Sequence, residues 1–111
     1  MISITRERWC AFVKEYVASG KNYKMRIIGN SMLPTLYPNT LIEVQRKPME
    51  ELKIGDIVVF FSQQKYFIIH RLIKKIKKED GFVLITKGDN NSFVDKYNIT
   101  IRNYIGICKC I

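Results

Sequence analysis

The sequence predicts a mainly β protein with one N-terminal helix, and two observations support this. Apolar residues recur at spacings of three and four over residues 5–19, as on one face of an α-helix. From residue 23 onward, short β-branched and aromatic runs alternate with turn residues, which is typical of a β-barrel or a folded sheet. The length of 111 residues favours a single domain, with the helix in 1–22 and the β core in 23–111.

The first predicted element is an amphipathic helix over residues 5–19. Ser3 or Thr5 can cap its start, and Gly20 suits its end. Its apolar stripe either packs on the core of the domain or contacts a membrane surface or a partner. The polar face mixes acidic with basic residues, which favours packing on the core. The stripe consists of Trp9, Phe12, Val13, Tyr16 and Val17.

Six β runs follow the helix. Their sequences are YKMRIIG, TLIEVQR, GDIVVFF, YFIIHRLIKKI, FVLIT and ITIRNYIGICKCI. In the fourth run, strand alternation places His70 on the same inward face as Ile68 and Leu72.

The net charge of +9 favours an anionic binding partner. The run RLIKKIKK, residues 71–78, is either a solvated hairpin end or a contact for acidic lipid or an acidic leader peptide. Nucleic acid is disfavoured, because the sequence lacks interleaved aromatics, a recognisable helix-turn-helix and zinc spacing.

Cysteine and histidine usage predicts neither a disulfide framework nor a metal site. Cys10, Cys108 and Cys110 are an odd number of thiols, and the chain has one histidine. No cofactor is expected. No apolar window is long enough for a membrane helix, and the N-terminus does not resemble a signal peptide. We therefore expect a cytoplasmic protein, with peripheral contact to a membrane left open.

Four polar residues could form a hydrolytic site. Ser31, in GNSMLPTL, is a nucleophile only if a base takes its proton. His70 could be that base, although a single histidine in an apolar strand is more often a satisfied core residue. Asp89, in the turn-rich stretch TKGDNNSFVD, could orient the histidine, and Asp95 could brace the loop; a plain polar turn is the alternative. Together they form the inventory of a Ser–His hydrolase.

The order of four sequence boxes resembles the signal peptidase I family. The boxes are GNSMLPTL, GDIVVF, IIHRLI and TKGDNN, with Asp95 six residues after Asp89. They look most like the S26-type branch of archaea, the endoplasmic reticulum and some spore-forming bacteria, which pairs serine with histidine. The resemblance runs from about Gly29 to Gly106.

This resemblance implies a serine endopeptidase that cuts extended peptides after small residues. Its implied fold is a set of coiled antiparallel β-sheets of the signal peptidase/LexA-like type. Ser31 matches the nucleophile, His70 the general base, and Asp89 and Asp95 the supporting acids. In the implied mechanism Asp89 accepts the second ring N–H of His70. Extended substrate would pair with backbone near residues 25–29 or 58–61.

Four residues around the serine are candidates for oxyanion or substrate contacts. Many relatives carry a hydroxyl residue two places before the serine, as a second oxyanion donor, where this chain has Gly29. Asn30 or a backbone N–H could be the oxyanion donor instead. Met32 and Pro34 are the other two candidates for contacts with the oxyanion or the substrate.

Signal peptidases are held at the membrane by a helix ahead of the serine box. Here 28 residues precede Gly29 and predict an amphipathic helix, so we expect a short form without that anchor, such as a leader-peptide protease. A membrane-bound partner could take the place of the anchor. An inactive peptide-binding or accessory module of the same fold is the second hypothesis. A LexA-like regulator is the third, and it lacks the expected lysine base and DNA-binding domain.

Overall fold

The computed structural model describes residues 5–110, and it is mainly β with one N-terminal helix, as the sequence predicts. Each of the six β runs corresponds to one strand, although β4 and β5 extend beyond their predicted runs. The elements are α1 (Arg6–Ala18), β1 (Tyr23–Arg26), β2 (Leu41–Gln45), a 3-10 turn η1 (Met49–Glu51), β3 (Ile57–Phe61), β4 (Phe67–Lys78), β5 (Gly81–Lys87) and β6 (Tyr104–Cys110).

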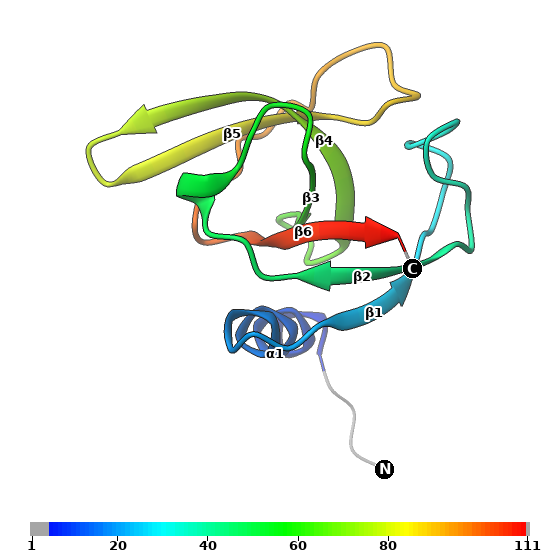
Figure 1. The fold of residues 1–111 in the computed structure, drawn as a ribbon, viewed down its shortest axis with the longest axis horizontal. Coiled ribbons are helices and arrows are strands. Elements are labelled where there is room, and N and C mark those ends of the chain that lie inside the picture. The colour runs from blue at the N-terminus through cyan, green and yellow to red at the C-terminus, as the bar shows by residue number, and fades with distance from the viewer. Residues whose placement is uncertain (1–4, 111) are drawn as a thin grey trace.

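All six strands belong to one antiparallel sheet in the order β1-β2-β6-β3-β4-β5. β4 is the longest strand. Its first part pairs with β3, and from Arg71 onward it pairs with β5. Figure 1 shows the resulting shape, in which β4 bends away from β3 and projects with β5 as a long hairpin. The bend leaves residues 67–70 of β4 without a strand on the β5 side, which matters for the site below.

The central strand β3 has both faces buried, and this divides the core into two clusters. Val59 and Phe61 face the cluster beneath α1, whereas Val58 and Phe60 face a second cluster under the β4–β5 hairpin. Alternation along a strand sends neighbouring side chains to opposite faces, so a continuous apolar run such as IVVFF suits a strand covered on both sides.

Helix α1 packs on the core of the domain rather than standing free. Thr5 caps its first turn by accepting a hydrogen bond from the Arg8 backbone N–H at 3.2 Å; Ser3, the other predicted cap, lies outside the described residues. The predicted stripe is partly wrong. Val13 and Val17 are buried, but Trp9 and Phe12 are 39% and 50% exposed. The buried face is rotated toward Cys10.

Candidate active site

Ser31 lies on the loop between β1 and β2, and the loop after β5 holds it in place. The Asn90 backbone N–H donates to the Ser31 carbonyl oxygen at 2.8 Å, and the Asn90 side chain donates to the carbonyl of Asn30. Gly88 makes this close approach possible, because a Cβ atom there would lie 2.7 Å from the Ser31 carbonyl oxygen. The glycine of the fourth sequence box is therefore required by packing against the serine loop.

Ser31, His70 and Asp95 form one continuous hydrogen-bonded chain. His70 Nε2 lies 3.1 Å from Ser31 Oγ, and His70 Nδ1 lies 2.7 Å from Asp95 Oδ2. An ionised carboxylate can only accept, so the ring proton belongs on Nδ1 and the Nε2 lone pair faces the serine hydroxyl. His70 is buried on strand β4, beside Leu72 on the same face, as the sequence predicts.

Thr86 also holds the carboxylate of Asp95, through the same oxygen that His70 contacts. Its hydroxyl donates to Asp95 Oδ2 at 2.5 Å, and the Asp95 backbone N–H donates to the Thr86 carbonyl. Thr86 is fully buried on β5. A carboxylate fixed at both its backbone and its side chain has little freedom to turn away from the imidazole.

The expectation that Asp89 accepts the ring N–H of His70 is wrong for this structure. Both Asp89 oxygens instead accept from Arg71, each at 2.8 Å, and Thr35 adds a third hydrogen bond at 2.5 Å. The Arg71 guanidinium bonded to Asp89 is the main cause that lowers the pKa of this carboxyl to about 2. Asp89 thus joins the loop after β5 to β4 and to the serine loop.

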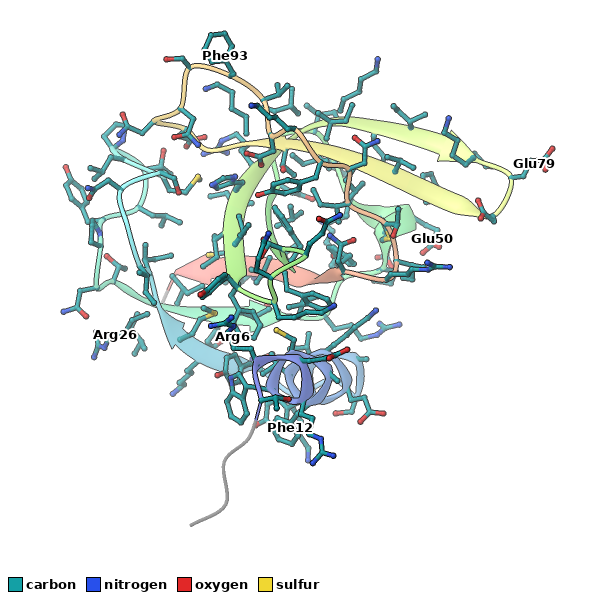
Figure 2. All side chains as sticks on the ribbon, turned by 180° about the vertical axis from the view of Figure 1, so that it is seen from behind. Arg6, Phe12, Arg26, Glu50, Glu79 and Phe93 are labelled. Atoms are coloured by element: carbon teal, nitrogen blue, oxygen red, sulfur yellow. The ribbon has the colours of Figure 1, made fainter. Side chains whose placement is uncertain are left out.

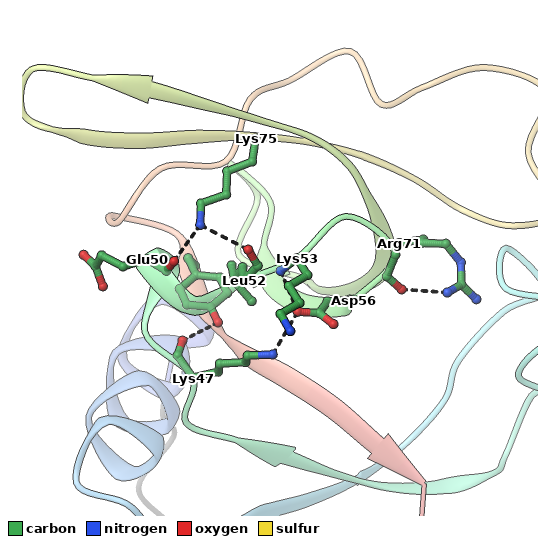
Figure 3. Close-up of polar contacts among 9 residues, drawn as sticks. Lys47, Glu50, Leu52, Lys53, Asp56, Arg71 and Lys75 are labelled. Carbon is green, nitrogen blue, oxygen red and sulfur yellow. Dashed lines mark hydrogen bonds and ion pairs between the residues drawn. The ribbon is translucent and has the colours of Figure 1, made fainter.

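Arg71 carries this connection further, to the turn before β3. Its second terminal nitrogen donates to the Gly55 carbonyl at 2.7 Å (Figure 3). Within that turn Asp56 accepts from the Lys53 backbone N–H and from Lys47. The GDIVVF box therefore supports the site indirectly, through the hydrogen bond between Gly55 and Arg71. It supplies no residue of the chain formed by Ser31, His70 and Asp95.

Replacing Asp89 by asparagine should lower stability in a pH-dependent way. A carboxyl group whose pKa falls on folding stabilises the protein at pH values above its unfolded pKa of 3.8. This stabilisation is lost as the pH falls through the folded pKa of about 2. After a discount for the partly exposed pair, we expect about 1–2 kcal/mol at pH 7 and about a third of that near pH 2.5. Urea unfolding of Asp89→Asn and wild type across this range measures the difference. A constant difference at every pH would contradict the ion-pair explanation.

A groove of about 500 Å³ begins at Ser31 and His70 and runs between two strands. One wall is β1 with the residues after it, and the other is the first part of β4. β1 pairs only with β2, and residues 67–70 of β4 pair only with β3, so both walls present unpaired strand edges within the described part of the chain. Its apolar lining includes Tyr23, Met25, Ile27, Ile28, Phe67, Ile68 and Ile69.

One of the two expected peptide-pairing segments agrees with this groove and the other does not. Residues 25–28 lie along the groove. Residues 58–61 belong to β3, whose backbone is already hydrogen-bonded to β4 on one side and to β6 and Asn103 on the other. That second expectation is wrong, because a strand in the middle of a sheet has no free edge.

The four candidate residues near the serine fall in different places. Met32 is buried, lines the groove and accepts from the Asp89 backbone N–H through its sulfur. Gly29, Asn30 and Pro34 are exposed and lie outside the groove lining. Among residues 5–110, no hydrogen bond uses the backbone N–H of Ser31, which leaves that donor available beside Oγ.

Sequence reasoning missed Thr86, Arg71 and Thr35 as supports of the site. Two of them were within reach, because Arg71 directly follows His70 and Thr86 opens the stretch that contains Asp89. Thr35 lies in the serine box itself. Their partners depend on how β4, β5 and the serine loop meet, and spacing does not give that.

The described residues hold no group of three or more metal-ligating side chains. In the same part of the chain, no helix has the length and apolar character needed to cross a bilayer.

Comparison with known proteins identifies the family. The Peptidase S24-like family model matches residues 3–108. The chain is similar to Signal peptidase I W of Bacillus subtilis, with 30% identity over 78 residues that cover 69% of this chain and 41% of the relative. It is 28% identical over 82 residues to the human protein named Putative signal peptidase complex catalytic subunit SEC11B, covering 72% of this chain and 49% of the relative.

A third relative is the Signal peptidase complex catalytic subunit sec11 of Dictyostelium discoideum, 37% identical over 73 residues, with 62% of this chain and 39% of the relative covered. The chain thus spans less than half the length of these relatives. No solved structure is a significant match. The match over residues 3–108 and the signal peptidases among its relatives establish that this chain belongs to the Peptidase S24-like family and confirm its resemblance to signal peptidase I.

Proposed function

We propose that this protein is a serine endopeptidase of the signal peptidase type, with Ser31 as nucleophile, His70 as general base and Asp95 as the acid that orients the base. The observation that carries the proposal is the chain of hydrogen bonds from Ser31 Oγ through His70 to Asp95, at the end of an open groove. A hydroxyl needs a base within hydrogen-bond reach to attack a carbonyl at neutral pH, and 3.1 Å meets that requirement.

In the acylation step, neutral His70 takes the Ser31 proton through Nε2 as Oγ attacks the scissile carbonyl carbon. The imidazolium that forms keeps its Nδ1–H on Asp95, whose negative charge stabilises it. The same Nε2–H then protonates the leaving amine, and the C–N bond breaks. The result is a Ser31 ester of the N-terminal peptide fragment.

In the deacylation step, water replaces the amine, and His70 takes a proton from the attacking water. The ester breaks and the proton returns to Ser31 Oγ. Both steps pass through an oxyanion, and the Ser31 backbone N–H is the donor that the structure leaves open for it. One such donor can contribute about 3 kcal/mol to the stability of the transition state.

The substrate in this proposal is an extended peptide lying in the groove between β1 and β4. Unpaired strand edges on both walls suit backbone pairing by strand addition, and the apolar lining suits uncharged side chains. Cleavage after small residues is proposed from the resemblance to signal peptidases. Relatives are named as catalytic subunits of a signal peptidase complex, so a partner subunit is part of the proposal.

A peptide-library cleavage assay read by mass spectrometry tests the function. It compares the wild type with Ser31→Ala, and uses Ser92→Ala, an exposed serine in the loop after β5, as the matched control. Reactions run from about pH 6 to 9, with and without anionic vesicles. We expect cleavage after small residues in the wild type and the control, and none with Ser31→Ala.

Each other outcome has a definite meaning. Cleavage that needs vesicles would add a membrane surface to the requirements. Cleavage that survives in Ser31→Ala would overturn the assignment of the nucleophile. A folded wild type that cuts nothing under any condition would favour the peptide-binding module instead.

A further inference from the structure

We propose that the groove selects substrates by an acidic side chain about four or five residues from the scissile bond, bound by Arg6 and Lys65 at the end away from Ser31. We call these two residues, with the aromatic rings of Trp9 and Tyr66, the basic end. This inference rests on the proposed function, since it treats the groove as the peptide-binding site.

The basic end and the serine belong to one groove. Arg6 and Trp9 come from the first turns of α1, Lys65 and Tyr66 from the β3–β4 turn, and all four line the groove that Ser31 and His70 also line. From His70 back to Tyr66 the chain covers four residues. At about 3.3 Å per residue this is roughly 13 Å, the reach of four residues of an extended peptide.

The positive charge at this end has no acid to neutralise it. The groove lining contains Arg6, Arg26 and Lys65 but no Asp or Glu. Across residues 5–110 the ion pairs are Lys47–Asp56, His70–Asp95 and Arg71–Asp89, and none of them involves Arg6, Arg26 or Lys65. Figure 2 shows Arg6 at the start of α1, apart from the labelled acids Glu50 and Glu79.

The two cations are held in place before any ligand arrives. The Arg6 guanidinium lies over the Tyr66 ring, 4.3 Å from its centroid, and the Lys65 ammonium lies 4.8 Å from the centroid of the Phe61 ring. The buried thiol of Cys10 donates to the Lys65 carbonyl at 3.2 Å and fixes the turn against α1. Charges that are already positioned lose less side-chain entropy when a carboxylate binds.

The basic run RLIKKIKK is a poorer candidate for the same role. It forms the part of β4 that pairs with β5, and none of its residues lines the groove. Arg71 is paired with Asp89, and Lys75 donates to the carbonyls of Glu50 and Leu52 (Figure 3). The cations that line the groove are therefore better placed than this run to contact a peptide that reaches Ser31.

The test uses peptides derived from a sequence that the enzyme cuts, with Glu, Gln or Lys placed singly at positions three to seven on either side of the scissile bond. We expect Glu to raise kcat/KM about fivefold over Gln at one position, four or five residues away on one side, and Lys to lower it. The preference should shrink between about 0.05 M and 0.5 M salt, because partly exposed charges are screened.

Two variants of α1 make a matched pair. Arg6→Glu reverses a charge in the groove, whereas Arg8→Glu makes the same change on the same helical turn at an exposed residue outside it. We expect Arg6→Glu to turn the Glu preference into a Lys preference and Arg8→Glu to leave it unchanged. Equal cleavage of the Glu, Gln and Lys peptides at every position would overturn the inference while leaving the peptidase intact.

A binding measurement separates the two proposals. Fluorescent Glu and Gln peptides are titrated against Ser31→Ala, with and without Arg6→Glu. Tighter binding of the Glu peptide that depends on Arg6 supports the inference even if the wild type cuts nothing. Binding to phosphatidylglycerol vesicles is measured with the same variants. If Arg6→Glu weakens vesicle binding and Arg8→Glu does not, while neither changes peptide binding, the basic end is a lipid contact and the inference is wrong.

Discussion

Asp95→Asn should reduce kcat/KM for a cleaved peptide by about 10³-fold or more while the protein stays folded. Asp95 accepts from Nδ1 of His70 at 2.7 Å, and its charge is positioned to stabilise the imidazolium that forms when Ser31 loses its proton. A neutral amide of the same size can occupy the site but cannot supply that charge. Steady-state kinetics on one defined peptide, with circular dichroism to verify folding, measures the effect.

Asp89→Asn is the matched control for this prediction. It is the same chemical change six residues earlier in the same loop, but Asp89 faces Arg71 and Thr35 rather than the imidazole. We expect less than about a tenfold loss, because no contact of Asp89 reaches the reacting atoms. A larger loss with Asp89→Asn than with Asp95→Asn would mean that the two acids have been assigned to the wrong roles.

Gly106→Ala should be strongly destabilising. A Cβ atom at this position would lie 2.3 Å from the Gln45 carbonyl oxygen and 3.3 Å from a methyl of Val17. β6 is paired with β2 on one side and β3 on the other, so the backbone cannot move aside without breaking a ladder. We expect a loss of about 3 kcal/mol or more in the free energy of unfolding.

Thermal and urea unfolding measure this loss, which corresponds to a fall in Tm of roughly 10 °C or more for a domain of this size. Lys109→Ala, an exposed position on the same strand, is the control and should stay within about 0.5 kcal/mol of wild type. A Gly106→Ala protein as stable as the control would show that β2, β6 and α1 are not packed as closely as described.

The strands could be predicted from sequence because each one is a short β-branched run bounded by turn residues, and the helix because of its 3.6-residue periodicity. The rotation of α1 could not. Trp9 was expected to be buried, but its large ring lies at the groove while the smaller Cys10 faces the core. Periodicity fixes which residues share a face, and only the shape of the opposing sheet decides how far that face is turned.

The site divides in the same way. Ser31 and His70 could be named because a nucleophile and a base have few candidates in a chain with one histidine. The sequence could not decide whether Asp89 or Asp95 contacts His70. Both lie on one polar, turn-rich stretch, and the path of the loop after β5 determines which of them faces the imidazole. That path is set by the hydrogen bond from the Asp95 backbone N–H to the Thr86 carbonyl, which closes the loop, and by the Arg71 side chain, which comes from β4.

The most direct test of the central claim is a double-mutant cycle on Ser31 and His70. The kcat/KM of Ser31→Ala, His70→Ala and the double variant would be measured on one cleaved peptide at the pH of highest activity. Because the two groups act as one proton-transfer unit in this account, each single change should remove nearly all activity and the double variant should be no slower than either. Losses that multiply in the double variant, or a single variant that keeps more than about a tenth of the wild-type rate, would contradict the account.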